Sequence, residues 1–449
     1  MSDGTFLTDD ASLRSDVRRL GELLGQTLVR QESQELLDLV EKVRKAVREG
    51  GGSEILENLD KKQSIQLVRA FANYFNLANI AEQVHRARVL TEQRVEGKSW
   101  LSRAVDRIIE AQGQDKELNK TNLQNWIDSF SVRPVFTAHP TEAARRSVLS
   151  KMNTIADLLD EKQTARRDRK LSEMIDLLWE TDELRLGQPE PLDEAVNALF
   201  YLDDLFALTI PEVLDDFARE LERLGLRVSP TARPLSFGTW IGGDRDGNPN
   251  ITPQVTKNAI VLQTGHFIRA MLAMLDELRQ ALSVSTRISG VSKELVASVE
   301  RDLSLLPEIE DRFRRINAEE PYRLKATAIR HRLILTQRRH AAGGPHVDNR
   351  DYKNTEQLLA DLTMMHRSLV ENRGELIAHG LLERIIRTVA CFGLTHATMD
   401  VREHSGAHHE ALAEIEKVGV ENLTGTAEKT FKTFVAIREL IRSEEHTSE

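Results

Sequence analysis

The sequence has little cysteine, no long apolar run and no excess of positive charge. Its single cysteine, Cys391, excludes an intrachain disulfide and suits a reducing compartment. No apolar stretch is long enough to span a membrane. The first residues, MSDGTFLTDDASLR, are polar and acidic, so we expect no signal peptide. The net charge of −10 argues against a partner of nucleic acid or anionic membrane. Together these absences predict a cytoplasmic protein.

Helical periodicity dominates what is present. Leu13, Val17, Leu20, Leu24 and Leu28 recur at steps of three or four residues, which is typical of a helix with one apolar face. The longer predicted helices span about residues 142–160, 166–185, 191–224, 254–284, 292–305, 320–338, 354–372 and 380–389. The 449 residues are enough for a large, mostly helical core.

Three short segments interrupt this helical rhythm. RPVFTA at 133–138, PLSFGTWIGG at 234–243 and LTHATMDVR at 394–402 are apolar, aromatic or alternating, and predict strands. Because helices separate them, we expect the strands to pair in parallel. Functional sites of parallel α/β folds form at the carboxyl ends of strands. The polar residues that follow each segment are therefore the candidates for chemistry.

The first polar tail contains His139 in VFTAHPTEAARR, between a predicted strand and a predicted helix start at Thr141 and Glu142. A helix N-terminus attracts anions, and the guanidinium of Arg145 or Arg146 can bind phosphate or carboxylate. Adjacent helical residues point about 100° apart, so at most one of these arginines faces the same pocket as His139. Local chemistry alone favours a structural histidine in a turn, with a general base or phosphate carrier as the alternative.

The second tail, TWIGGDRDGNPNIT, contains Trp240 and the charged run Asp244, Arg245 and Asp246. The run lacks the twelve-residue ligand pattern of a calcium loop, so we exclude that interpretation. On residue chemistry alone, Trp240 is predicted to be a core residue rather than a pocket wall.

The third tail, MDVREHSGAHH, places Arg402 at a strand end, where it is a candidate anion ligand. His404 and His408 are four residues apart, a spacing that can bind a metal on a helix. Because no third ligand is evident, a solvated helix start is the favoured interpretation.

Together these segments closely resemble phosphoenolpyruvate carboxylases of the bacterial type. The resemblance rests on VFTAHPTEAARR, WIGGDRDGNPNIT and MDVREHSGAHH, and on FANYFNLANIAEQVHRAR, WETDELR and EPYRLKATAIRHRL, all in the family's order. It runs from about residue 9 to about residue 440. One departure is Glu403–His404, where many members have glutamine and glutamate after the arginine.

The resemblance implies a predominantly α fold with a few parallel strands, as an incomplete (β/α)₈ TIM-type barrel among many helices. It implies the joining of phosphoenolpyruvate and bicarbonate to give oxaloacetate and phosphate, with Mg²⁺ or Mn²⁺ as cofactor. It assigns catalysis to His139, phosphate contact to Arg402, a second contact to Arg146, and substrate-pocket contact to Trp240. The complete enzyme is expected to be a homotetramer.

Family members continue roughly as far again, which predicts that residues 1–442 are the N-terminal part of one large domain. The metal ligands are expected in the other half, so we expect none in this chain and no turnover by it alone. Residues 443–449 do not resemble the family and are predicted to be a non-native tail. Two other hypotheses remain: a phosphohistidine transferase that uses His139, and a helical scaffold or regulatory subunit without catalysis.

Overall fold

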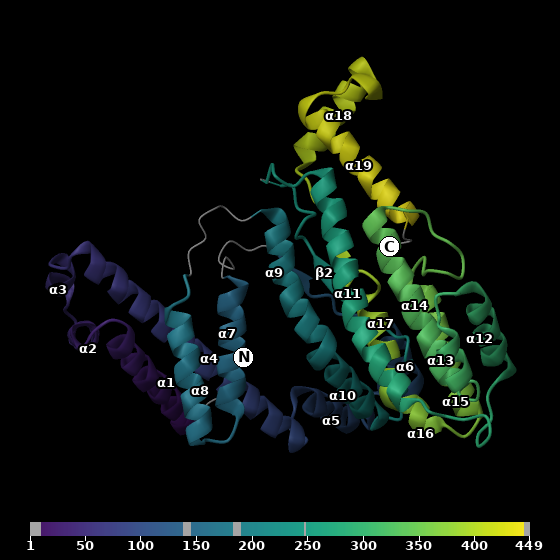
Figure 1. Cartoon of the computed structure of the whole chain (residues 1–449), viewed down its shortest axis with the longest axis horizontal. Coiled ribbons are helices and arrows are strands. Elements are labelled where there is room, and N and C mark those ends of the chain that lie inside the picture. The colour runs from purple at the N-terminus through teal and green to yellow at the C-terminus, as the bar shows by residue number, and fades with distance from the viewer. Residues whose placement is uncertain (1–9, 138–144, 183–189, 247, 444–449) are drawn as a thin grey trace. The chain divides into compact units, whose positions relative to one another are not determined.

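The structure is a computed structural model, and it describes residues 10–137, 145–182, 190–246 and 248–443 (Figure 1). These residues form two compact units. The first comprises the described residues of Met1–Arg103 and Thr141–Gln188, and the second those of Ala104–Pro140 and Pro189–Glu449. Among the described helices, none combines the length and the apolar character needed to cross a bilayer.

The first unit is a bundle of helices. Its elements are α1 (Asp10–Gln31), α2 (Gln34–Arg48), α3 (Ser53–Glu57), α4 (Lys61–Val95), the start of α5 (Trp100–Gln112), α7 (Arg146–Asp160) and α8 (Ala165–Trp179). A capping box between Asp60 and Gln63 begins α4. Arg88 of this helix pairs with Asp16 at 2.8 Å and with Asp160 at 2.9 Å. The segment FANYFNLANIAEQVHRAR therefore ties α4 to α1 and α7.

The second unit contains the sheet and the larger core. Its helices are the rest of α5, η1 (Lys116–Leu118), α6 (Lys120–Ser129), α9 (Pro191–Asp204), η3 (Leu205–Thr209), α10 (Ile210–Glu222), α11 (Pro253–Ala281), α12 (Lys293–Leu305), α13 (Asp311–Ile316), α14 (Pro321–Ala342), α15 (Thr355–Glu371), α16 (Glu375–Ile377), η4 (Ala378–Leu382), α17 (Glu383–Phe392), α18 (Ser405–Val418), η5 (Val420–Asn422) and α19 (Gly425–Ser443). The helices α11 and α14 lie side by side in its centre (Figure 1).

The three predicted strands are confirmed, although the regular strands are short. They are β1 (Val135–Phe136), β2 (Gly238–Thr239) and β3 (Thr398–Met399), and they form a parallel sheet in the order β1-β2-β3. Isolated parallel bridges extend the pairing beyond the strands, at Val132↔Leu235 and at Asp244↔Arg402. The predominantly α fold with a few parallel strands is thus confirmed. In the part of the chain that the structure describes, the sheet has these three strands.

Most of the predicted helices are confirmed within about four residues. The helix expected over 166–185 ends earlier, at Trp179, and residues 183–185 lie outside the described residues. The start of another helix also needs correction. We expected a helix to begin at Glu142, after a cap at Thr141. The structure begins α7 at Arg146, because Arg145 has the extended backbone angles φ −63° and ψ 138°. Residues 138–144, and with them Thr141 and Glu142, lie outside the described residues. Arg146 is therefore the first residue of a helix instead of part of its second turn.

Three aromatic rings and an imidazole form a cluster next to the sheet of the second unit. The Phe237 and Phe392 rings are stacked with centroids 4.8 Å apart, and Phe206 packs edge-on against Phe392 at 5.1 Å. His396 lies 5.3 Å from both Phe206 and Phe392 and is fully buried. Such pairs stabilise a core beyond their buried area by about 0.5–1.5 kcal/mol each. The cluster fixes the segment between α17 and β3, and so fixes where β3 ends.

Candidate functional site

The carboxyl ends of the three strands meet at one edge of the sheet. The backbone N–H of Trp240 donates to Phe136 at 2.9 Å, and that of Asp400 donates to Thr239 at 2.9 Å. Because the strands are parallel, residues that leave each strand emerge side by side. The edge predicted to carry chemistry therefore exists. Trp240 and Arg402, both predicted as site residues, lie on it.

Arg402 stacks on Trp240. The guanidinium carbon of Arg402 lies 3.8 Å from the centre of the Trp240 ring, within cation–π distance. Its Nη1 pairs with the Asp244 carboxylate at 3.1 Å. Backbone hydrogen bonds hold the two segments together, from Arg402 N–H to Gly243 O at 3.0 Å and from Arg245 N–H to Arg402 O at 2.9 Å. The guanidinium of Arg402 is thus oriented by the Trp240 ring and by the Asp244 carboxylate.

Trp240 is half-buried, so the interpretation of this residue as a core residue is wrong. Its indole N–H donates to Asp400 Oδ2 at 3.2 Å. Arg133 also reaches Asp400, with Nη2 at 2.7 Å from Oδ1 and Nη1 at 3.2 Å from Oδ2. A two-pronged contact of this kind is a strong, directional ion pair. The site therefore contains two arginines, two aspartates and a tryptophan from three strand segments.

Arg133 and Asp400 were not predicted as site residues. Arg133 opens the first strand segment and Asp400 lies inside the third, and the two are 267 positions apart in the sequence. The available signal was a charged residue of opposite sign in each of two strand segments, Arg133 in the first and Asp400 in the third, since charges in strands are usually paired.

Two glycines allow the strands to approach this closely. A Cβ at Gly243 would lie 2.3 Å from the backbone oxygen of Asp400, and one at Gly242 would lie 2.7 Å from the Cβ of Ala259. Gly242 also has a positive φ of 82°, which side-chain-bearing residues rarely adopt. The GG of WIGGDRDGNPNIT is therefore a packing requirement that brings Asp244 beside Arg402.

Arg245 is buried and stabilises the turn that follows β2 through hydrogen bonds. Its Nη2 donates to Thr256 Oγ1 at 2.7 Å, and that hydroxyl donates to Gly242 O at 2.7 Å. Burial lowers the pKa of Arg245, an effect that the charge of Glu403 partly opposes. Arg245 therefore positions the turn rather than facing the edge where Arg402 lies.

The other predicted residues are outside the described residues, in the other unit, or at the start of a helix. His139 lies outside the described residues. Arg146 is an exposed residue of the first unit, whereas Trp240 and Arg402 belong to the second. His404 caps α18, its Nδ1 accepting from the N–H of Gly406 at 3.1 Å, and His408 packs against Phe434 at 5.7 Å. The structure thus agrees with the helix-start interpretation of His404 and His408.

The carboxylates at this edge do not suit a divalent metal. Magnesium and manganese prefer several carboxylate or carbonyl oxygens. Here Asp244 is paired with Arg402, and Asp400 with Arg133 and Trp240. The described residues of this edge do not gather three metal-ligating side chains. The chemistry that this geometry supports is anion binding by an oriented guanidinium.

Comparison with known proteins identifies the family. A sequence profile of phosphoenolpyruvate carboxylase matches residues 13–446. The chain belongs to the phosphoenolpyruvate carboxylase family. A phosphoenolpyruvate carboxylase of Roseiflexus castenholzii is 36% identical over 432 residues, which is 90% of this chain and 46% of that relative. One from Bradyrhizobium diazoefficiens is 33% identical over 436 residues, covering 91% of this chain and 45% of the relative.

A third phosphoenolpyruvate carboxylase, from Ralstonia nicotianae, is 33% identical over 471 aligned residues. The alignment covers 98% of this chain and 46% of that relative. The chain thus spans about half the length of the curated relatives that it matches. Membership of the phosphoenolpyruvate carboxylase family agrees with the resemblance seen in the sequence.

Proposed function

We propose that this chain contributes one part of the active site of a phosphoenolpyruvate carboxylase. The observation that carries this proposal is the guanidinium of Arg402, stacked on Trp240 and held by Asp244 at the carboxyl edge of a parallel sheet. In the described part of the chain, the hydrogen bonds of this guanidinium to side chains occupy Nη1 alone. Nε and Nη2 are then the groups that receive a phosphate oxygen.

The proposed reaction joins bicarbonate to phosphoenolpyruvate and yields oxaloacetate and phosphate. Bicarbonate attacks phosphorus, which gives carboxyphosphate and the enolate of pyruvate. His139 takes the proton of carboxyphosphate as it divides into carbon dioxide and phosphate, and the enolate then attacks carbon dioxide. Carboxyphosphate, the enolate and phosphate are all anionic, which is why permanent positive charge is needed at the site. Arg402 supplies that charge, and Arg146 is proposed as a second contact.

Trp240 and Asp244 act on Arg402 in this proposal. The ring limits the guanidinium to one plane, and the carboxylate fixes its rotation within that plane. Preorganisation of this kind removes the entropy that a free arginine loses when it binds an anion. Arg133 orients Trp240 indirectly. It holds the carboxylate of Asp400, and this carboxylate accepts the hydrogen bond of the Trp240 indole.

The coverage of the relatives supports further parts of the proposal. Residues 1–442 are proposed as the N-terminal part of a single large domain, in which β1, β2 and β3 are the first strands of a (β/α)₈ barrel. Mg²⁺ or Mn²⁺ is proposed to bind residues outside this chain, since the carboxylates at the sheet edge do not suit it. The complete enzyme is proposed to be a cytoplasmic homotetramer.

Binding of phosphoenolpyruvate tests the proposal. The ligand is titrated into the 449-residue chain and its Arg402→Gln variant by calorimetry. Loss of a charged hydrogen-bond donor of this kind weakens binding roughly 10-fold or more. Arg384→Gln is the matched control, because Arg384 is a half-exposed arginine that pairs with Asp215 at 2.8 Å. Equal affinity of the Arg402→Gln and Arg384→Gln variants would exclude the proposed role.

A second assay separates the carboxylase from a phosphohistidine transferase. The chain is incubated with phosphoenolpyruvate labelled with radioactive phosphate and then analysed for acid-labile phosphate. The carboxylase proposal predicts no stable label on His139, because the phosphoryl group of phosphoenolpyruvate passes directly to bicarbonate. Acid-labile label on His139 that a His139→Asn variant lacks would replace the carboxylase proposal with the transferase.

A further inference from the structure

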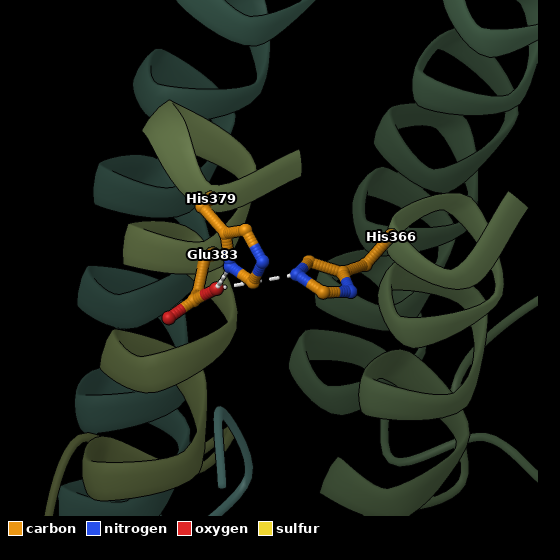
Figure 2. A group of neighbouring side chains, drawn as sticks. All are labelled: His366, His379 and Glu383. Atoms are coloured by element: carbon orange, nitrogen blue, oxygen red, sulfur yellow. Dashed lines mark hydrogen bonds and ion pairs between the residues drawn. The ribbon is translucent and has the colours of Figure 1, made fainter. Parts of the chain in front are cut away.

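Two histidines and a glutamate converge in the second unit, at the end of α17 that is remote from β3. His366 lies on α15, His379 lies in the π-helical turn η4, and Glu383 is the first residue of α17 (Figure 2). The donor atoms of the three side chains all lie within 4.8 Å of one another. Because α17 ends at Phe392 and β3 begins at Thr398, this cluster is separated from the sheet edge by the length of a helix.

The local fold explains how the three side chains meet. His379 and Glu383 are four residues apart, so they lie on one face of consecutive helical turns. Gly380, between them, has the non-helical angles φ −88° and ψ −130°, which kinks the chain within η4. His366 enters from α15, a helix that packs against both η4 and α17. The kink therefore turns His379 toward a histidine on another helix.

One oxygen of Glu383 faces both imidazoles. Its Oε2 lies 3.2 Å from Nε2 of His366 and is also in contact with Nδ1 of His379 (Figure 2). The other oxygen, Oε1, pairs with Arg387 one turn further along α17. Arg387 also pairs with Asp215 at 3.2 Å. The carboxylate of Glu383 is thus held by Arg387 at Oε1. Its other oxygen, Oε2, faces the two imidazole nitrogens.

A second carboxylate lies behind His379. Nε2 of His379 is 3.9 Å from Oε1 of Glu375, while Nδ1 faces Glu383. Metal-bound histidines usually donate a hydrogen bond from the nitrogen that does not bind the metal. At 3.9 Å, Glu375 makes an ion-pair contact and would reach this nitrogen after a small movement. The side chains of Glu383 and His366 are 8% and 13% exposed, whereas that of His379 is 48% exposed. The cluster is therefore enclosed by protein on one side and open to water on the other.

We infer that His366, His379 and Glu383 bind one divalent transition-metal ion of the zinc type, with water in the remaining position. Two imidazole nitrogens and one carboxylate oxygen are a donor set that suits Zn²⁺ or Co²⁺, whereas Mg²⁺ requires oxygen ligands. Ligands at about 2.0–2.2 Å from a tetrahedral ion are separated from one another by roughly 3.3 Å. The 3.2 Å between His366 and Glu383 agrees with this spacing. His379 needs a small outward shift, which its half-exposed side chain allows.

The bound ion would join α15 to η4 and α17, which otherwise meet here through hydrogen bonds and packing. It is independent of the proposed carboxylase chemistry, because none of its ligands lies at the sheet edge. Its donor set also differs from that expected for the Mg²⁺ or Mn²⁺ of the family reaction. The two kinds of metal are therefore distinguishable by competition: millimolar Mg²⁺ should leave this site occupied by the softer ion.

Cobalt spectroscopy on the metal-free 449-residue chain tests the inference. Titration with Co²⁺ in excess Mg²⁺ should give visible d–d absorption that saturates at one ion per chain and is displaced by Zn²⁺. Substitution of either imidazole, as His366→Gln or His379→Gln, should weaken binding roughly 100-fold or more and abolish this spectrum. Zinc should also raise the unfolding temperature of the unsubstituted chain and leave that of the His379→Gln variant unchanged.

The matched control is the double variant His404→Gln/His408→Gln, which removes two histidines with the i, i+4 spacing of a helical metal site. It should retain the cobalt spectrum and the stoichiometry of one. Loss of the spectrum in this control, or its persistence in both His366→Gln and His379→Gln, would place the ion elsewhere and overturn the inference. Absence of saturable Co²⁺ binding to the folded, unsubstituted chain would overturn it as well.

Discussion

The guanidinium carbon of Arg402 lies over the indole of Trp240, 3.8 Å from its ring centre. The two residues belong to strand segments that are far apart in the sequence, and the parallel bridge between Asp244 and Arg402 brings them together. One amino group of the guanidinium contacts the carboxylate of Asp244, and we propose that its other N–H groups bind a ligand. We propose that Trp240 acts by orienting Arg402, in addition to the expected contact with the substrate pocket.

Replacement of Trp240 by leucine should weaken phosphoenolpyruvate binding without unfolding the chain. A cation–π contact contributes about 0.5–2 kcal/mol, so we expect an affinity loss of about 2- to 30-fold by calorimetric titration. Trp240→Phe keeps a ring face but loses the hydrogen bond to Asp400, and should lose less. The control is Trp126→Leu, since Trp126 is 55% exposed on α6. Unchanged affinity in Trp240→Leu would show that Arg402 does not depend on the ring.

His139→Asn should separate the two products in the complete enzyme that contains this segment. If His139 acts only after carboxyphosphate has formed, phosphate release from phosphoenolpyruvate should exceed oxaloacetate formation in the variant. Coupled assays of both products measure the ratio, and His331→Asn, a half-buried histidine on α14, should leave it at one. A parallel loss of both products to zero would contradict the role assigned to His139.

Lys325→Met should destabilise the second unit strongly. Lys325 is fully buried, and its Nζ lies 2.7 Å from both Asp302 and Asp361 and 2.8 Å from Ser298. Removal of the cation leaves the buried carboxylate of Asp302 without its ion-pair partner and leaves Asp361 with Arg332 alone. Breaking a buried ion pair in this way costs about 3–5 kcal/mol in comparable cases. Methionine has a similar volume, so the loss would reflect charge rather than a cavity.

The control for this prediction is Arg330→Met on the same helix. Arg330 pairs with Asp276 at 3.0 Å, but the two side chains are 29% and 35% exposed, so solvent screens the pair. Ion pairs near the surface contribute about 0–1 kcal/mol. Thermal unfolding followed by circular dichroism should therefore show a much larger fall for Lys325→Met. Similar falls in the two variants would mean that the buried carboxylates find other partners or become protonated.

Much of the framework could be predicted from local patterns. The strands were found because β-branched and aromatic residues interrupt a helical period, and Arg402 was found because it follows such a run. The pairing of Arg133 with Asp400 could not be predicted, because it depends on a register between segments 267 positions apart. The start of the α7 helix was misplaced because a threonine followed by a glutamate is a good cap in sequence.

The buried charges illustrate a second limit. The segment EPYRLKATAIRHRL was predicted as part of a helix, and α14 confirms that prediction. Nothing in its sequence indicated that Lys325 and Arg332 are buried and paired with aspartates of other helices. The His379–Glu383 spacing was a local signal for the metal-type cluster, but His366 is on another helix and completes it only in three dimensions.

His396 predicts how stability depends on pH. It is fully buried beside three phenylalanines, and neither ring nitrogen has a hydrogen-bond partner among the described residues. Burial lowers the pKa of His396 from 6.5 to about 4; the nearby Asp203 opposes this shift, and His266 adds to it. The folded state therefore holds the neutral form, and the unfolded state binds a proton at higher pH.

The stability that the neutral His396 contributes is fully present above pH 6.5. It is lost as the pH falls from 6.5 toward 4, because the unfolded state binds the proton first. A lowering of this size corresponds to roughly 3 kcal/mol of unfolding free energy across that interval. Urea unfolding at several pH values should show a smaller loss of stability for His396→Asn, a substitution that tolerates the positive φ of 68° at this position. His409→Asn, at an exposed position on α18, should follow the unsubstituted chain. If His396→Asn and His409→Asn lose stability in parallel between pH 6.5 and 4, His396 does not titrate in the folded state as its burial requires.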